Sequence, residues 1–477
     1  MPQIFWHDRK ALLSVDVHKI STNNKYKIVT SSVQKEVRIW EFEFENDLKL
    51  AVAPLSVSFI ANLTGHNTAI NQVKFSPSTE HNLLASGDCH GRITIWQISD
   101  SPPPPPQDEL PPNKENWVRF KILNHDSDVS AICWSPDGTQ LASVSNDDCL
   151  CMHQALTGVR QFVIRNFRHF PNGICWDPLG KYIITMSADR KMDIVDAVKG
   201  TRLKYFSTAE LPMRHLRMNE EITLEPKLYK LFHDDQLFSF QRGVTFSPNA
   251  EVVAAPCAHL ELGSHDVFGT YIFKREDLAR ERPSAFYPCE RPTFLVRFSP
   301  LILDLLETST NVLGLPYRLI WAALTKDSVL FYDSQHESPI GIVSNMHYNA
   351  LSDASWSSDG QVLVLSSLEG YCSFIKFKVD AWGTVTTRPI PVPTSPQLIE
   401  DKKRKKKAPV VTSVAEELSA QKKSPIRPVA TTPKNNITPL TKFFKSGKAK
   451  DTTLGKEAVK EDTPKVKKRV QLITLTD

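Results

Sequence analysis

The feature that most limits the fold of this chain is a short motif that recurs along its first 358 residues. Each copy is an apolar, strand-like stretch that ends in an aromatic residue, Ser and Pro, or in a close variant of these. The copies are VKFSP (73–77), ICWSP (132–136), ICWDP (174–178), VTFSP (244–248), VRFSP (296–300) and ASWSS (354–358), and SVDVHK (14–19) occupies the equivalent place near the N-terminus. The chain therefore contains seven related units that begin 42 to 70 residues apart, and this predicts a modular architecture.

Two more strand-like stretches follow the markers. Second stretches such as NLLASG, QLASVS, YIITMS and VLVLSS come after a turn. Third stretches are VRIW (37–40), RITIW (92–96), CLCMH (149–153), MDIVD (192–196), VLFYD (329–333) and CSFIKF (372–377). All are short, rich in β-branched and aromatic residues and bounded by turn residues. Seven such units predict an all-β fold, a seven-bladed β-propeller of the WD40 type over residues 1–380. We expect IFWH (4–7) to supply the outer strand of the last blade and so close the ring.

Blades of this type contain a buried hydrogen-bond relay of His, Ser or Thr, Asp and Trp, and two units match it in part. The matching residues are His66, Ser86 and Trp96 in residues 65–96, and His125, Ser143 and Asp147 in the next unit. His90 stands where the Asp of the first unit is expected, and His153 replaces the Trp of the second. We therefore interpret these histidines as structural donors of the scaffold rather than as catalytic bases.

Several classes of function have no support in the sequence. The eight cysteines form no CxxC pair, which favours reduced, buried thiols over a zinc site or a disulfide framework. Neither a phosphate-binding GxxxxGK[ST] loop nor a GxSxG elbow occurs. No apolar run approaches the ~20 residues of a membrane span, and the N-terminus carries charges where a signal peptide is apolar. We expect a non-enzymatic protein without cofactor, metal or membrane anchor.

Charge divides the chain into an acidic body and a basic tail. Residues 381–477 contain 21 Lys and Arg against 9 Asp and Glu, while residues 1–380 contain 37 against 44. The tail is also rich in proline and lacks regular apolar spacing. Such a composition cannot bury enough apolar surface to offset the entropy of ordering, so residues 381–477 are predicted to be disordered and to carry short motifs.

Some stretches of the body are not general propeller sequence. They are NKENW (113–117), LFHDDQLFSFQRGVTFSP (231–248), LPYRLIWAALTKDSVLFYDSQ (315–335), SNMHYNALSDASWSSDG (344–360) and SSLEGYCSFIKF (366–377). Together they resemble the B-type, p60-like WD40 subunit of chromatin assembly factor 1, whose propeller is similar to that of HIRA-type histone chaperones.

The resemblance implies a nuclear, non-enzymatic scaffold of a three-part histone chaperone, which deposits H3–H4 on DNA after replication and repair. Its expected partners are the large subunit, the small histone-binding WD40 subunit and, through these, histones H3–H4. The alternative is a nuclear WD40 adaptor of another machine, such as a HIRA-type chaperone or a substrate receptor of a ubiquitin ligase.

Two tail motifs have a predicted role. The run of six cations in DKKRKKKAP indicates nuclear import or contact with phosphate, against a simple solubilising role; its residues are Lys402, Lys403, Arg404, Lys405, Lys406 and Lys407. In NITPLTKFFKSG, Leu440, Phe443 and Phe444 have the spacing of a peptide that binds the sliding clamp, although Ile437 stands in the slot of the usual Gln. Exposed adjacent aromatics favour docking on some partner.

The chain ends in KVKKRVQLITLTD (465–477), an alternating stretch without a neighbouring partner strand. It looks like the motif by which HIRA and the p60-like WD40 subunit bind the histone chaperone anti-silencing function 1. The resemblance assigns the contacts to two cations, which would meet acidic residues, and to three aliphatic anchors in an extended peptide. These residues are Lys468, Arg469, Val470, Leu472 and Leu475.

Five Ser-Pro or Thr-Pro pairs in the tail are candidate sites for proline-directed phosphorylation, with ordinary tail prolines as the alternative reading. The residues are Ser395, Ser424, Thr432, Thr438 and Thr463. A phosphate on Thr463 would place negative charge beside the cations of the C-terminal motif and weaken binding of its partner.

Overall fold

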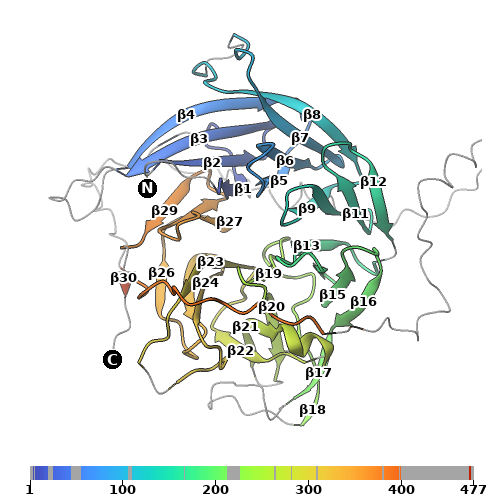
Figure 1. Ribbon diagram of the computed structural model, residues 1–477, viewed down its shortest axis with the longest axis vertical. Coiled ribbons are helices and arrows are strands. Elements are labelled where there is room, and N and C mark those ends of the chain that lie inside the picture. The colour runs from blue at the N-terminus through green and yellow to red at the C-terminus, as the bar shows by residue number, and fades with distance from the viewer. Residues whose placement is uncertain are drawn as a thin grey trace, which may run out of the picture.

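The computed structural model is an all-β ring of seven blades (Figure 1). It describes residues 4 to 398, apart from 5, 20–24, 45–54, 106–109, 166, 212–225, 263–264, 281, 308–309, 379–380 and 397, and then residues 472–473. Within this part of the chain the sole helix is a short 3-10 helix, η1 (Arg275–Ala279). The predicted fold class is confirmed.

The first four blades follow one another along the chain, each an antiparallel sheet of four strands. Blade 1 has β1 (Leu12–Val17), β2 (Lys25–Ser32), β3 (Glu36–Phe44) and β4 (Leu55–Thr64); blade 2 has β5 (Ile70–Phe75), β6 (Leu83–Asp88), β7 (Arg92–Ser99) and β8 (Asn116–Asn124). Blade 3 has β9 (Val129–Trp134), β10 (Gln140–Ser145), β11 (Cys149–Gln154) and β12 (Arg160–Ile164); blade 4 has β13 (Pro171–Trp176), β14 (Tyr182–Ser187), β15 (Lys191–Asp196) and β16 (Arg202–Phe206).

The last three blades are less regular. Blade 5 has β19 (Thr245–Phe246), β20 (Val252–Glu261), β21 (Asp266–Lys274) and β22 (Ala285–Cys289), preceded by a hairpin of β17 (Thr208–Leu211) and β18 (Lys227–Lys230). Blade 6 has β23 (Leu295–Leu303), β24 (Arg318–Leu324), β25 (Ser328–Asp333) and β26 (Gly341–Ser344), to which β30 (Leu472–Ile473) adds a fifth strand. Blade 7 has β27 (Leu351–Trp356), β28 (Val362–Ser367) and β29 (Cys372–Lys376).

Each marker motif contributes the innermost strand of a blade and the turn after it. In blades 3 and 7 the marker tryptophan reaches the preceding blade: the indole Nε1–H of Trp134 donates to the carbonyl of Lys74, and that of Trp356 donates to the carbonyl of Arg297. The marker serine orders the turn, as in blade 3, where the Ser135 hydroxyl accepts from the Gln140 N–H at 2.9 Å. The recurrence of aromatic–Ser therefore reflects one contact between blades and one turn.

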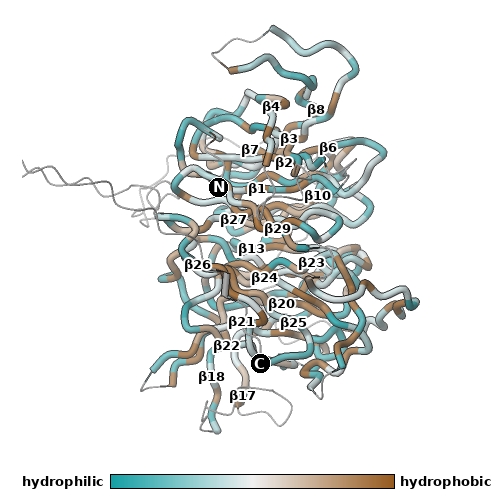
Figure 2. Tube along the Cα trace, turned by 90° about the vertical axis from the view of Figure 1, so that its left-hand side faces the viewer, coloured by the Kyte–Doolittle hydropathy of each residue, from teal (hydrophilic) through white to brown (hydrophobic). Residues whose placement is uncertain are grey.

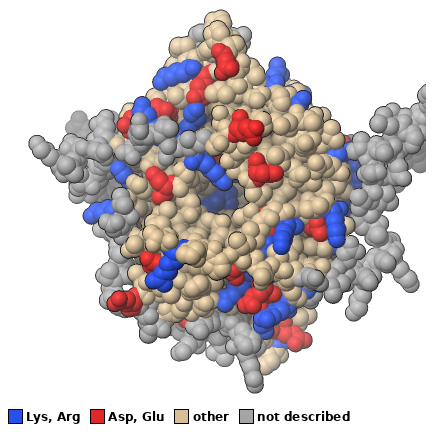
Figure 3. Space-filling model, in the orientation of Figure 1, with Lys and Arg blue, Asp and Glu red and all other residues tan. Residues whose placement is uncertain are grey.

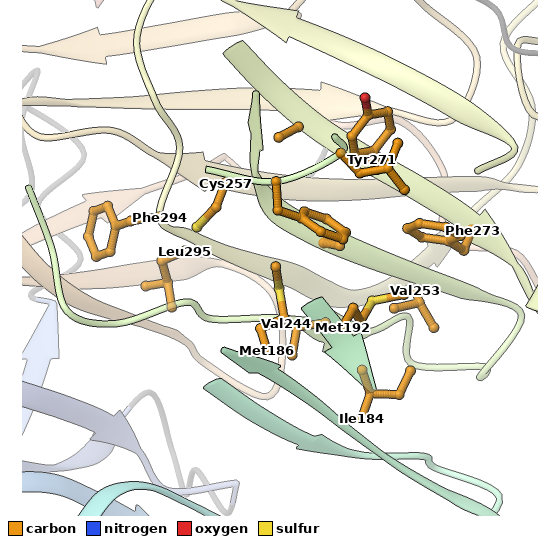
Figure 4. Packing of buried hydrophobic residues seen from close by; sticks show 14 of the residues in the cluster. Ile184, Met186, Met192, Val244, Val253, Cys257, Tyr271, Phe273, Phe294 and Leu295 are labelled. Carbon is orange, nitrogen blue, oxygen red and sulfur yellow. The ribbon is translucent and has the colours of Figure 1, made fainter. Parts of the chain in front are cut away.

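Apolar side chains fill the space between neighbouring blades. The largest cluster spans blades 4 to 7, and Figure 4 shows part of it, where Met186 and Met192 of blade 4 lie close to Val244 and Val253. Burial of such side chains contributes roughly 1.5–3 kcal/mol each. Hydrophobic residues are concentrated in the strands and hydrophilic residues in the loops that project from the ring (Figure 2).

Charged residues of the innermost strands link the two ends of the ring. The fully buried carboxylate of Asp353 in blade 7 accepts from the Ser14 hydroxyl of blade 1 at 2.7 Å. It also lies 3.4 Å from Lys74 Nζ of blade 2 and 3.0 Å from Arg297 Nη2 of blade 6. Although burial favours the neutral acid, the charges of Lys74 and Arg297 lower the pKa of Asp353. On the face shown in Figure 3, the centre of the ring is hollow and basic side chains are visible inside it.

The prediction that IFWH forms the outer strand of the last blade is wrong for the residues that the structure describes. Residues 6–9 form a turn, and Asp8 and Arg9 have positive φ angles of 51° and 61° that end any extended conformation. Trp6 is fully buried and packs edge-on against Trp40, with ring centroids 5.0 Å apart, and it also contacts Phe374. The N-terminus therefore joins blades 1 and 7 through side-chain packing.

The predicted start of the disordered tail at residue 381 is also too early. Residues 381–396 and 398, which we name the strap, extend along the ring across blades 6, 5 and 4 (Figure 1). Val385 forms a β-bridge with Leu303, and the Thr386 N–H donates to the Ile302 carbonyl. Pro-rich composition correctly indicated the absence of a regular sheet, but the ring supplies contacts that composition does not show.

Candidate functional site

The two predicted relays are assembled as hydrogen-bonded clusters. In blade 2, His66 Nε2 lies 2.6 Å from the Ser86 hydroxyl, which also accepts from the Trp96 indole N–H at 2.8 Å. In blade 3, His125 contacts the Ser143 hydroxyl at 2.8 Å and the Asp147 carboxylate at 2.9 Å. All six predicted residues therefore meet as expected within their blades.

One member of the blade 2 relay was assigned to the wrong position. His66 Nδ1 lies 2.7 Å from the carboxylate of Asp88, which also accepts from the backbone N–H groups of His90 and Arg92. The side chain of His90 is exposed. Asp88 stands 22 residues after His66, the same separation as between Asp147 and His125 in blade 3. It stands two residues after the relay serine, whereas Asp147 stands four residues after its serine. The acid is present, and counting from the relay histidine, rather than from the relay serine, identifies it.

Two further relays were missed. In blade 1, His7 Nε2 lies 3.1 Å from the Thr30 hydroxyl, and the Trp40 indole N–H donates to the same hydroxyl at 3.1 Å. In blade 7, His347 contacts Glu369 at 2.6 Å and Ser373 at 2.9 Å. The signal was available in the sequence, because His66, His125 and His347 all stand four residues before the first residue of an innermost strand.

Burial and charge give these histidines different pKa values. Burial, and then the charge of Arg38, lower the pKa of His7 to about 3. Burial opposes the charged form of His125 too, but hydrogen bonds with Asp147 and Cys151 raise its pKa to about 9. Burial and the neighbouring His125 lower the pKa of His153 to about 4. Each histidine thus serves as a fixed structural group at neutral pH.

The C-terminal motif is described only at Leu472 and Ile473, which form β30. This strand pairs antiparallel with β26 at the outer edge of blade 6, with Val343 opposite Leu472 and Ile342 opposite Ile473. In Figure 1, β30 is the red arrow next to β26. These two residues thus add to the edge of the blade 6 sheet from outside. Lys468, Arg469, Val470 and Leu475 lie outside the described residues.

Ser395, a candidate phosphorylation site, lies on the strap and contacts a buried ion pair. The Arg275 Nε–H donates to its hydroxyl at 3.0 Å, and Arg275 holds Asp177 of blade 4 in a bidentate contact. Asp177 takes the place of the marker serine in ICWDP and still orders the turn by accepting from the Leu179 N–H. The sequence showed that Asp177 replaces the marker serine, but it did not show that the partner of Asp177 is Arg275, 98 residues away.

The other predicted tail residues lie outside the part of the chain that the structure describes. They are Lys402, Lys403, Arg404, Lys405, Lys406 and Lys407 of the basic run, Leu440, Phe443 and Phe444, and the candidate phosphorylation sites Ser424, Thr432, Thr438 and Thr463. Within the described ranges, no cluster of three or more His, Cys, Asp or Glu could hold a metal ion. Nor does any described helix have the length and apolarity needed to cross a membrane.

The seven blades and their His–Ser relays define a β-propeller of the WD40 type. Residues 1–381 match the family described as the CAF1B/HIR1 beta-propeller domain. The chain belongs to this family.

Individual relatives span most of the chain. It is 33% identical to the B-type subunit of chromatin assembly factor 1 from Gallus gallus over 430 residues, 85% of this chain and 72% of the relative. It is 32% identical to the Mus musculus protein of that name, over 80% and 67% of the two chains, and 28% identical to the Saccharomyces cerevisiae protein, over 79% and 85%. Protein HIR1 of Candida albicans is 25% identical over 67% of this chain and 33% of the relative.

Proposed function

We propose that this chain is the propeller subunit of a chromatin assembly factor 1 complex, a nuclear, non-enzymatic scaffold for deposition of histones H3–H4. The observation that carries the proposal is the family match over residues 1–381, together with the relatives named for chromatin assembly factor 1 that share most of the chain. The HIR1 relatives match a smaller share of their own length, which favours the chromatin assembly factor role over the HIRA-type alternative.

In this role the ring binds the large subunit, and the complex also contains the small histone-binding WD40 subunit. Histones H3–H4 are contacted through those subunits. A pull-down of the full chain from nuclear extract tests this assignment: H3, H4 and a large charged subunit should co-purify. Recovery of ubiquitin ligase components in their place would support the adaptor alternative and contradict the proposal.

The C-terminal motif is proposed to recruit anti-silencing function 1 by adding a strand to a sheet of that chaperone. The pairing of Leu472 and Ile473 with β26 supports this mode, because the segment there adopts an extended backbone against a sheet edge. Burial of three aliphatic side chains gives roughly 5–9 kcal/mol, while ordering the backbone costs about 1–2 kcal/mol per residue. Binding is therefore modest and reversible, as transfer of a histone cargo requires.

A binding assay on the full-length chain separates the two roles. The double variant Val470→Ala/Leu472→Ala should lose anti-silencing function 1 and keep the large subunit. The matched control Gln471→Ala/Thr474→Ala removes two polar side chains from the same stretch and should keep both partners. Equal affinity of the two double variants for anti-silencing function 1 would refute the anchor assignment.

A further inference from the structure

The strap is held by two sets of contacts that differ in kind. Its proximal part is attached through the Val385–Leu303 bridge and through Trp382, whose ring contacts Phe331 and Phe377 with centroids 5.6 and 4.8 Å away. Its distal part, residues 389–396 and 398, follows blades 5 and 4 and contains prolines at alternate positions. The distal part receives hydrogen bonds from Arg275 and from Tyr182, whose hydroxyl donates to the Pro396 carbonyl at 2.9 Å. Ile390 and Leu398 also pack against hydrophobic clusters of the ring.

Arg275 has little capacity to accept a further anion. Besides donating to Ser395, it donates to both carboxylate oxygens of Asp177 and to the Ala250 carbonyl, so four of its five N–H groups are engaged. The exposed fractions of the Arg275 and Asp177 side chains are 1% and 0%. The positive charge next to Ser395 is therefore already neutralised by a buried carboxylate.

We propose that Ser395 is a phosphorylation site and that its modification detaches the distal strap from blades 4 and 5. A phosphate carries a charge of about −1.5 to −2 near neutral pH. At the half-buried Ser395 hydroxyl it would stand close to the buried carboxylate of Asp177, which shares Arg275 with it, and the two negative charges would repel each other. It would also exceed the space of a hydroxyl packed against a guanidinium. Release of the distal strap into water relieves both costs.

The sequence and exposure of the site fit a proline-directed protein kinase. Ser395 is followed by Pro396, Thr394 before it is exposed, and Val392 has an exposed fraction of 74%. Among the five Ser-Pro or Thr-Pro pairs of the tail, Ser395 is the one that lies in the described part of the chain. In the reaction the Ser395 oxygen forms a bond to the γ-phosphorus of a nucleoside triphosphate. The bond from that phosphorus to the β–γ bridging oxygen breaks, the nucleoside diphosphate leaves and the serine proton passes to the kinase base.

Release would change the place from which the tail leaves the ring. With the strap attached, the chain departs near Tyr182 of blade 4; with the distal part released, it departs after Thr386 beside blade 6. The freed residues could reach up to about 3.3–3.6 Å each. The basic run at 402–407, which begins four residues beyond Leu398, would move with them. One phosphate would thus reposition the basic run relative to the blades.

The test uses full-length protein treated with a proline-directed kinase and ATP, with phosphorylation mapped by mass spectrometry. Hydroxyl-radical footprinting then reports release of the distal strap at Tyr182, which is buried and bonded to it. Trp382, which belongs to the proximal strap and packs against Phe331 and Phe377, is the internal reference. We expect Ser395 to be phosphorylated, Tyr182 oxidation to rise several-fold and Trp382 oxidation to stay constant. Amine cross-links from the basic run to Lys181 of blade 4, which is exposed, should disappear.

Three variants complete the test. Ser395→Glu should increase Tyr182 oxidation in part, and Ser395→Ala should keep Tyr182 protected. Ser424→Glu adds the same charge to another Ser-Pro pair and should leave Tyr182 oxidation unchanged. The proposal is overturned if Ser395 stays unmodified while Ser424 is phosphorylated, or if Tyr182 remains protected after modification. An increase in Trp382 oxidation as large as that of Tyr182 would contradict a local mechanism. Full release of the distal strap by Ser395→Ala would contradict a mechanism driven by charge.

Discussion

Asp177 and Arg275, 98 residues apart, form a bidentate ion pair that joins blade 4 to η1 of blade 5. Their N–O distances are 2.9 and 2.5 Å, and neither side chain reaches solvent. The guanidinium also lies over the Tyr182 ring, 5.1 Å from its centroid. A marker residue that is serine in most blades has thus become one half of a link between blades.

Removal of this acid should destabilise the ring strongly. Asp177→Ser restores the residue type of the other markers but leaves Arg275 buried without a counter-charge, which costs about 3–5 kcal/mol. The double variant Asp177→Ser/Arg275→Met should recover much of that loss because no charge remains buried. Chemical denaturation measures the free energy of unfolding of the single and the double variant. Asp126→Ser, at an exposed carboxylate in the loop before β9 of blade 3, is the control and should change stability little.

The blade 2 relay predicts different effects for two neighbouring residues. Asp88→Ala removes the acceptor for His66 and for two backbone N–H groups, and it should lower the free energy of unfolding by about 2–3 kcal/mol. His90→Ala removes an exposed side chain and should change it by less than about 0.5 kcal/mol. Equal losses in the two variants, measured by urea denaturation, would argue against Asp88 as the relay acid.

Acid should destabilise the ring before its carboxylates titrate. The pKa values of His7 and His153 are lowered to about 3 and 4, so both stay neutral in the folded state while the unfolded chain binds protons below about 6.5. Their stabilising contribution is present above pH 6.5 and declines as the pH falls, by about 2 kcal/mol each at pH 5. His125 has a raised pKa of about 9, so its contribution is complete below pH 6.5 and declines as the pH rises toward 9.

Denaturation midpoints at pH 7 and pH 5 check this expectation. The variant His7→Gln/His153→Gln should be less stable at pH 7 but should lose less stability on acidification than the original chain. Identical losses in the two proteins would show that other groups cause the acid sensitivity.

Phosphorylation of Thr463 should weaken recruitment of anti-silencing function 1. The phosphate would lie close in sequence to Lys465, Lys467 and Lys468. It would pair with these lysines in competition with the acidic residues of the partner. Titration calorimetry with tail peptides should show weaker binding for phosphothreonine at 463, and the difference should shrink at high salt. A peptide that starts further upstream and carries phosphate at Thr432 is the control, with unchanged affinity expected.

The sequence allowed the ring to be predicted because its pattern is local and repeated. Period-2 alternation, turn residues and an aromatic–Ser marker each fix a strand without reference to the rest of the chain. The relay residues His66, Ser86 and Trp96 were recognisable for the same reason, since their spacing reflects one blade. Blade 5 was the least evident because β19 has only two residues and β20 contains an irregularity at Cys257.

What the sequence could not show depends on contacts between distant segments. The role of His7 is set by Thr30 and Trp40, and the apolar run around it reads equally well as a strand. The strap follows the ring because Arg275, Tyr182 and Leu303 offer contacts there, and none of these is evident from a proline-rich composition. Asp88 is a different case, because its separation of 22 residues from His66, equal to that of Asp147 from His125, was available in the sequence.

In the described residues every blade except blade 6 is made from one uninterrupted stretch of sequence. Blades 7 and 1 share no strand pairing but meet through side-chain packing and hydrogen bonds such as that from the Val17 N–H to the Ser355 hydroxyl. The chain could therefore begin at a different blade without any change in the order of the blades around the ring. A circular permutant, cut in the loop between β12 and β13 and with the present ends of blades 7 and 1 joined by a linker, would keep every strand pairing of the seven blades.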